Sequence, residues 1–282
     1  MYRYLTSAAC AAALAAFACG AAVADPAPAP AAASTSYAVV PQAVIGVDYS
    51  YLSLNHGGDA NTFGGEAGGI VPFGGGFSGQ VFGAYHSLDL SHGGGTVNSY
   101  NVGGAAAWSD DMGRIGLNVA YTGDNTHGAN LDVTNYGVFG EWYASDQFTL
   151  GLRGGGATLS ASSGGFGGFF GSGSTTGGYV GAEVVGYATP DLDVQAHVNY
   201  ISVKKGNQTA LGAQAEWLFS EDIPVSGWIG YDYTTLSGGG FSENINTFSV
   251  GLRYYIGGGG SLVQHHRSGV DGWGPAALDV QY

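Results

Sequence analysis

The first candidates for chemistry are three histidines in polar, glycine-rich segments. They are His56, His92 and His127, each followed by a glycine and each with an aspartate close by. Imidazole nitrogens are common zinc ligands, so convergence of the three segments would create a three-histidine metal site. Their spacing matches no metal-binding motif, and histidines also occur in long loops by chance. We therefore expect no metal and no other cofactor, and keep these three histidines as the metal candidates.

Hydrolytic chemistry would need a serine or an acid beside a histidine. His86 and Ser87 are adjacent, and adjacent residues of a strand point to opposite faces. His197 has acids near it but no evident nucleophile. Walker, dinucleotide-binding and zinc motifs are lacking, and the many Gly-x-Gly matches follow from the 53 glycines of the chain. The sequence therefore does not predict an enzyme.

The composition suits a membrane barrel. Only 10% of the 282 residues are charged, and the mean hydropathy is +0.09. After the N-terminus, no stretch reaches the roughly 18 to 20 apolar residues of a spanning helix, so a membrane location would require a closed barrel. The net charge of −14 leaves no electrostatic footprint for nucleic acid, which is excluded as a partner.

The N-terminus predicts export. Residues 1–24 have a positive start, an apolar stretch too short to span a membrane and an Ala-x-Ala site, as in a cleaved signal peptide. Lipoprotein processing at Cys19 is the alternative, although its flanking residues fit poorly. Cys10 and Cys19 are the two cysteines, so a mature chain would have no thiol chemistry. Residues 25–42 are rich in Ala and Pro and predict a periplasmic linker.

From residue 43 onward, apolar residues alternate with polar or small ones. Clear examples are residues 45–51, 114–121, 192–200 and 248–256. A period of two is typical of strands with two different faces. We predict an all-β fold, an antiparallel transmembrane β-barrel over residues 43–257.

The connections predict about twelve strands. Five short turns are expected at Pro72–Gly76, Ser109–Gly113, Ser145–Gln147, Thr189–Asp191 and Ser220–Pro224. Six mostly longer connections alternate with them, at Asn55–Asn61, Leu88–Thr96, Thr122–Leu131, Leu159–Thr176, Val203–Asn207 and Leu236–Asn244. This asymmetry is expected when every second hairpin faces the periplasm, and it places both termini there. Residues 258–282 would then be a C-terminal periplasmic tail, either disordered or folded back into the barrel mouth.

Aromatic residues gather at both predicted strand ends, as rings do at the two membrane interfaces. The girdle beside the short turns would contain Phe73, Phe77, Trp108, Trp142, Phe148, Tyr187, Trp217 and Trp228. The opposite girdle would contain Tyr51, Phe63, Tyr85, Tyr100, Tyr121, Tyr136, Tyr179, Tyr200, Tyr231 and Phe248.

The last predicted strand carries a polar residue, a glycine and two hydrophobic residues at alternating positions, namely Ser249, Gly251, Tyr254 and Ile256. This pattern resembles the assembly signal of Gram-negative outer-membrane β-barrels, which include porin-like and opacity-like small barrels. The resemblance implies insertion by the outer-membrane assembly machinery and contact with outer-membrane lipid and lipopolysaccharide. In that family the signal usually ends the chain, whereas residues 258–282 follow it here.

Charges that face a barrel lumen cost far less than charges that face lipid. We assign nine charged residues to the lumen by alternation, or by this cost alone for Glu66 and Glu183. They are Asp48, Glu66, Arg114, Glu141, Arg153, Glu183, Glu216, Asp232 and Arg253. Six acids and three bases make the interior mildly negative. This balance either favours cations or reflects ion pairs that brace the wall.

Twelve strands lie between the filled eight-stranded and the open sixteen-stranded barrels. Many inward positions are small, among them Gly103 and Gly116, and would leave volume for water. We therefore expect a porin-like channel for passive diffusion of small polar or cationic solutes, unless the Phe-containing segment Ser160–Gly178 plugs it. The alternative is a non-conducting surface barrel with an adhesive or structural role. The sequence indicates neither the solute nor the oligomeric state.

The predicted topology can be tested with protease on intact cells. Cleavage is expected within Leu159–Thr176, because this segment would face outside, and not within Ser220–Pro224. Mass spectrometry of the fragments identifies the cut. The reverse pattern would mean that the barrel is inserted the other way round.

Overall fold

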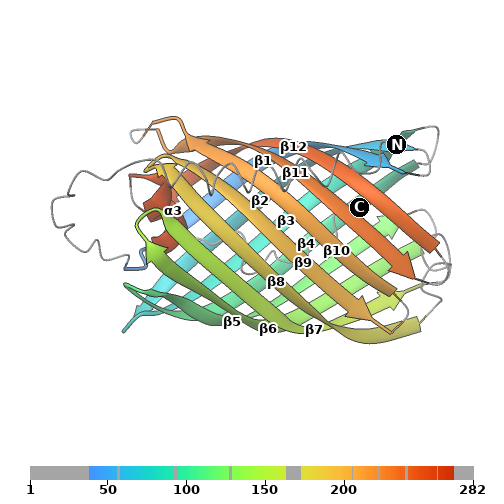
Figure 1. The fold of residues 1–282 in the computed structure, drawn as a ribbon, viewed down its shortest axis with the longest axis horizontal. Coiled ribbons are helices and arrows are strands. Elements are labelled where there is room, and N and C mark those ends of the chain that lie inside the picture. The colour runs from blue at the N-terminus through green and yellow to red at the C-terminus, as the bar shows by residue number, and fades with distance from the viewer. Residues whose placement is uncertain are drawn as a thin grey trace, which may run out of the picture. The chain divides into compact units, whose positions relative to one another are not determined.

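The structure is a computed structural model that describes residues 38–55, 58–91, 95–126, 129–162, 173–204, 206–220, 223–238, 241–258 and 260–269. Twelve antiparallel strands close into one barrel, with each strand beside its sequence neighbours and β1 paired with β12 (Figure 1). The strands are β1 (Gln42–Leu54), β2 (Asp59–Gly74), β3 (Phe77–Leu90), β4 (Gly95–Asp110), β5 (Gly113–Thr126), β6 (Ala129–Ser145), β7 (Phe148–Ala161), β8 (Gly173–Thr189), β9 (Leu192–Val203), β10 (Gly206–Leu218), β11 (Val225–Gly238) and β12 (Phe241–Gly257). The predicted closed antiparallel barrel of twelve strands is confirmed.

The outer face of the barrel is apolar. Residues such as Val47, Val119 and Leu152 are more than half exposed, and their strand neighbours point inward. A continuous apolar surface of this extent is unfavourable in water and marks contact with lipid. The wall therefore places its apolar face toward the membrane and leaves the lumen for polar residues.

The aromatic girdles are present in part. Beside the short turns, Phe73, Phe77, Trp108, Trp142 and Trp217 are exposed on the outer face. At the other end the exposed rings are those of Tyr51, Phe63, Tyr85, Tyr100, Tyr136, Tyr200 and Phe248. The assignment of Tyr179, Tyr187 and Trp228 to the girdles was wrong, because Tyr179 and Tyr187 are buried and Trp228 lines the lumen.

Most of the predicted long connections are shorter than expected. For example, β5 continues to Thr126 and β6 begins at Ala129, so the segment Thr122–Leu131 is largely paired sheet. At the end opposite the short turns, the long connection is the one between Ala161 and Gly173. Its residues 163–172 lie outside the described part of the chain. Polar strand ends can resemble loops in sequence, because strands that extend past the membrane need no apolar face.

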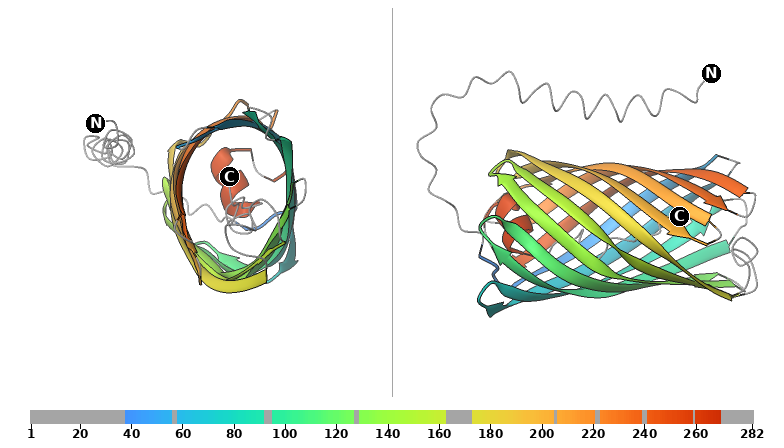
Figure 2. Two further views of the ribbon diagram at one scale, coloured as in Figure 1. Left: turned by 90° about the vertical axis from the view of Figure 1, so that its right-hand side faces the viewer. Right: turned by 60° about the horizontal axis from the view of Figure 1, so that its bottom comes forward.

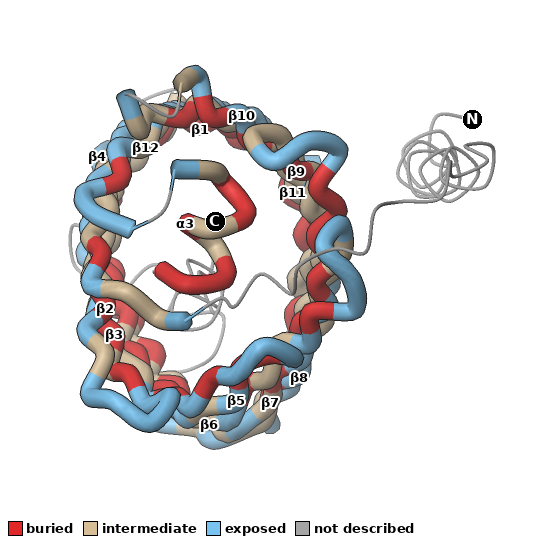
Figure 3. Tube along the Cα trace, turned by 90° about the vertical axis from the view of Figure 1, so that its left-hand side faces the viewer, coloured by how far each residue is buried: buried red, intermediate tan, exposed pale blue. Residues whose placement is uncertain are grey.

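A short helix, α3 (Leu262–Ser268), follows β12 and lies in the lumen, surrounded by the strands of the barrel (Figures 2 and 3). Its backbone contacts the short-turn end, since the Val263 N–H donates to Pro190 O at 3.2 Å. Ser268 O accepts from the Val40 N–H, also at 3.2 Å. This part of the tail is folded back into the barrel mouth, as in the second of the two alternatives above. No helix among the described residues is long and apolar enough to cross a membrane.

The lipid-facing role of the wall predicts a depth-dependent cost of charge. Val119 lies near the middle of β5, and we expect Val119→Arg to destabilise the barrel by about 2–4 kcal/mol. The control is Met112→Arg in the exposed β4–β5 turn, where the expected cost is about 0–1 kcal/mol. Reversible denaturant unfolding in lipid vesicles measures both costs. Equal costs would contradict the assignment of this face to lipid.

Candidate functional site

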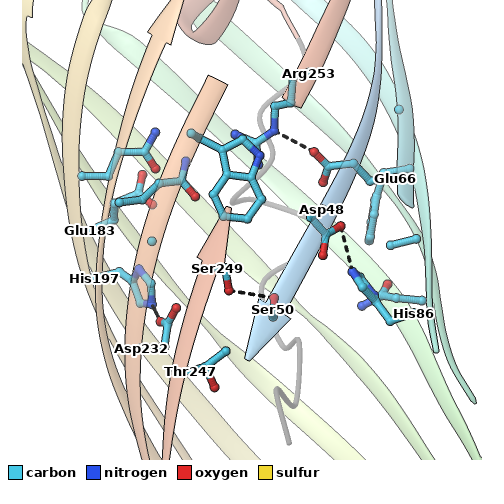
Figure 4. A pocket seen from close by; sticks show the side chains of 18 of the residues that line it. Asp48, Ser50, Glu66, His86, Glu183, His197, Asp232, Thr247, Ser249 and Arg253 are labelled. Carbon is cyan, nitrogen blue, oxygen red and sulfur yellow. Dashed lines mark hydrogen bonds and ion pairs between the residues drawn. The ribbon is translucent and has the colours of Figure 1, made fainter. Parts of the chain in front are cut away.

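The lumen contains a cavity of about 350 Å³ lined by both polar and apolar side chains. Serine, threonine, asparagine and glutamine line it together with charged residues of both signs, some of which are drawn in Figure 4. The expectation that small inward residues leave open volume is only partly right. Phe82 and Phe139 lie against Gly103 and Gly116, so rings from neighbouring strands fill the space over these glycines.

Arg253 on β12 joins two carboxylates across the lumen. Its Nε lies 2.6 Å from Glu66 Oε1, and its Nη1 lies 2.5 Å from Glu216 Oε2. The guanidinium also lies 5.2 Å from the centre of the Trp228 ring, within the range of a cation–π contact. For Glu66 and Glu216, these contacts agree with the interpretation in which the charged residues of the lumen form ion pairs that brace the wall.

Two histidine–aspartate pairs stand on separate parts of the wall (Figure 4). His86 Nε2 is 3.2 Å from Asp48 Oδ1, and His197 Nε2 is 2.9 Å from Asp232 Oδ1. Each pair joins a strand to one two positions away in the barrel, β3 to β1 and β9 to β11. Both aspartates therefore face the lumen beside a basic side chain.

Arg267 anchors α3 in the barrel. Its guanidinium donates to Thr149 Oγ1 at 3.1 Å, to Ser145 O at 2.6 Å and to Phe148 O at 3.1 Å. It also lies over the rings of Tyr143 and Tyr187, at 4.9 and 5.3 Å from their centres. Three hydrogen bonds and two ring contacts make this buried cation the main polar attachment of the helix.

The C-terminal end of α3 is held by a second guanidinium. Arg114 Nη2 donates to Arg267 O at 2.7 Å, and the Tyr143 hydroxyl donates to the same oxygen at 3.1 Å. The last carbonyls of a helix lack partners within the helix and carry partial negative charge, so a cation stabilises them. Arg114 thus binds the helix rather than the open cavity.

His265 packs α3 against the seam of the barrel. Its ring stacks on Tyr255 at 4.3 Å between centres, and its Nδ1 accepts from Gln42 Nε2 at 3.1 Å. Burial lowers the pKa of His265 to about 4, with a further decrease from neighbouring His266 and an opposing increase from Glu216. His265 is therefore neutral at neutral pH, which suits its apolar, stacked position.

The nine charged residues assigned from the sequence separate into two groups. Asp48, Glu66, Glu141, Arg153, Glu183, Asp232 and Arg253 line the cavity. Arg114 and Glu216 are almost fully buried near α3 instead. In the assembly signal, Tyr254 and Ile256 are exposed outside, whereas Ser249 Oγ meets Ser50 Oγ at 2.8 Å across the closing seam. Gly251 lies under Trp228, because a Cβ there would be 2.5 Å from its Nε1.

The sequence interpretation missed Asp193, His266 and Arg267. Asp193 lies in the alternating segment 192–200, so its inward position was available from the sequence. The positions of His266 and Arg267 were not, because they depend on a short helix that forms inside the barrel. The metal candidates His56, His92 and His127 lie outside the described residues.

No protein-family model and no curated protein sequence matches the chain. Among solved structures, it is similar to the translocator domain of the autotransporter NalP from Neisseria meningitidis. That match has a TM-score of 0.52 and 13% identity, and it covers 89% of this chain and 98% of the other. The KdgM porin is similar with a TM-score of 0.47 and 9% identity, covering 75% of this chain and 99% of the other. The match to the NalP translocator domain shows that the chain has the fold of outer-membrane β-barrels, and its apolar outer wall is suited to contact with lipid.

Proposed function

We propose that the protein is a passive outer-membrane channel for small polar solutes with a preference for cations, in which α3 controls the short-turn end. The lumen cavity carries this proposal, because a volume of about 350 Å³ whose lining includes charged, amide and hydroxyl groups can hold water and polar solutes. Its walls supply hydrogen bonds and charges to a passing solute. No step of covalent chemistry is needed for this function.

The charge around the cavity and α3 supports a preference for cations. Among the described residues, seven carboxylates lie around the cavity and α3, namely Asp48, Glu66, Glu141, Glu183, Asp193, Glu216 and Asp232. The guanidinium groups are four, Arg114, Arg153, Arg253 and Arg267. An excess of negative charge within low-dielectric walls attracts cations and raises their local concentration.

The position of α3 favours a second candidate, a closed surface barrel. Its anchoring by Arg267 and Arg114 narrows the lumen at the short-turn end. If α3 stayed bound in the lumen permanently, the barrel would not conduct. The function of the protein would then belong to the end opposite the short turns. The two candidates differ in whether release of α3 opens a path for ions.

Planar-bilayer conductance of the protein and of Arg267→Ala distinguishes these candidates. The variant loses the three hydrogen bonds and both ring contacts of the anchor, so we expect a severalfold rise in single-channel conductance or open probability. Arg153→Ala is the matched control, because it removes the same charge from a side chain that binds Asn199 on β9. Silence of all three proteins, each running as a folded, heat-modifiable barrel, would contradict the channel and favour the surface role.

The cation preference predicts an effect of the cavity carboxylates. The double variant Glu141→Gln, Glu183→Gln should lower the cation-to-anion permeability ratio, because both residues line the cavity and both lose their charge. The reversal potential in a salt gradient measures the ratio. Asp111→Asn in the exposed β4–β5 turn removes a charge outside the cavity and should leave the ratio unchanged. An unchanged ratio in the double variant would assign both glutamates to bracing the wall.

A further inference from the structure

Asp193 on β9, Glu216 on β10 and His266 on α3 converge beneath the helix. One ligand atom from each residue lies within 4.8 Å of the others. His266 Nδ1 is 3.3 Å from Asp193 Oδ2, and its Nε2 is 3.9 Å from Glu216 Oε2. Both carboxylates are completely buried, and His266 is 19% exposed. The three side chains thus form a small, nearly dry cluster with mixed oxygen and nitrogen donors.

This cluster is short of positive charge. Asp193 and Glu216 are directly opposite each other on adjacent strands, so their side chains share one face of the sheet. Arg253 binds both Glu216 and Glu66, and His266 contacts both Asp193 and Glu216. Even with a positive charge on His266, the three carboxylates would keep one negative charge in excess. Two buried anions side by side are unfavourable unless a cation compensates them.

The hydrogen bonds around the cluster leave one oxygen available. Glu216 Oε1 accepts from the Ser226 and Tyr255 hydroxyls, at 2.5 and 2.6 Å, and Glu216 Oε2 accepts from Arg253 Nη1 at 2.5 Å. Asp193 Oδ1 accepts from Gln195 Nε2 at 3.4 Å, whereas the buried Asp193 Oδ2 accepts no hydrogen bond. Fixing one oxygen of a carboxylate while the other faces the centre is how outer partners orient metal ligands.

We propose that Asp193, Glu216 and His266 bind a divalent first-row transition metal ion, of the borderline class of Zn²⁺. Two carboxylate oxygens and one imidazole nitrogen suit such an ion, and a water molecule would complete a tetrahedral shell. Ligand atoms about 2.0–2.1 Å from zinc are about 3.4 Å apart. The donor atoms of the three residues already lie within 4.8 Å of one another, so they must move closer together to bind one ion. The imidazole nitrogen disfavours Mg²⁺ and Ca²⁺, which prefer oxygen ligands.

Metal binding here would join the helix to the wall. Two ligands belong to neighbouring strands and the third belongs to α3, so the bound ion connects the helix to two strands of the wall. The ion also supplies the two positive charges that the buried carboxylates lack. This proposal concerns the helix and the wall alone and does not depend on whether the barrel conducts.

Zinc binding is measured on untagged protein extracted from outer membranes in mild detergent, treated with chelator and titrated with Zn²⁺ by calorimetry. We expect one saturable site per barrel that excess Mg²⁺ does not displace. His266→Gln should weaken binding at least tenfold, because the glutamine side chain lacks the imidazole donor. His197→Gln is the matched control, since this lumen histidine binds Asp232 outside the cluster and should leave the affinity unchanged.

A second variant, Asp193→Asn, keeps the test valid if His266→Gln does not fold into a heat-modifiable barrel. It removes one negative charge and weakens the free oxygen donor, so at least a tenfold loss of affinity is again expected. The proposal is overturned by a lack of saturable zinc binding to the unaltered protein. Displacement of zinc by Mg²⁺, or unchanged affinity in the folded variants of the cluster, would overturn it as well.

Discussion

Closure of the sheet between β1 and β12 is the constraint on which the other features depend. In lipid, each unpaired backbone N–H or C=O group costs several kcal/mol, so an open sheet edge cannot remain in the membrane. Here β1 and β12 pair in register from Gln42 with Gly257 to Leu54 with Ile245. Once the wall is closed, every side chain has only two directions, toward lipid or toward the lumen. The charged residues of the spanning strands therefore collect in a confined interior.

That confinement explains why one guanidinium, that of Arg253, is shared between two carboxylates. A lone carboxylate in the lumen would be poorly solvated, and Arg253 compensates both Glu66 in the cavity and Glu216 beneath α3. The side chain of Arg253 can do so because Gly251 leaves room for Trp228, which in turn lies under the guanidinium. A glycine in the assembly segment thus contributes to the electrostatics of the interior. Removing one partner of a buried pair typically costs about 3–5 kcal/mol, because the other charge is left uncompensated, so loss of Arg253 would destabilise the wall.

Much of this architecture follows from the period of two in the sequence. Where alternation was ambiguous, the cost of charge in lipid alone placed Glu66 and Glu183 in the lumen, and both line the cavity. The assignment of Tyr187 and Trp228 to the outer girdle was wrong, because an aromatic ring near a strand end fits either an interface or a polar interior. The predicted strands also ended too early, because paired segments that extend beyond the membrane carry polar residues on both faces. The number of strands was nevertheless predicted correctly, whereas the lengths of the connections were not.

The helix α3 could not be derived from the sequence in the same way. Seven residues are too few for a stable isolated helix in water, so its stability comes from tertiary contacts. Those contacts come from residues distant in sequence, such as Arg114 and Thr149. A local pattern cannot contain that information. The segment 265–267 therefore carries little signal until the barrel around it is known.

The short connection between β12 and α3 has a consequence for how the helix behaves. Only residues 258–261 separate the two elements, a reach of about 14 Å when fully extended. A released helix would therefore swing at the mouth of the barrel and could not diffuse away. Tethers of this length give effective concentrations in the millimolar range. Rebinding is thus a concentration-independent, intramolecular step, and a free peptide or solute that competes for the same surface would need to be present at similar concentration.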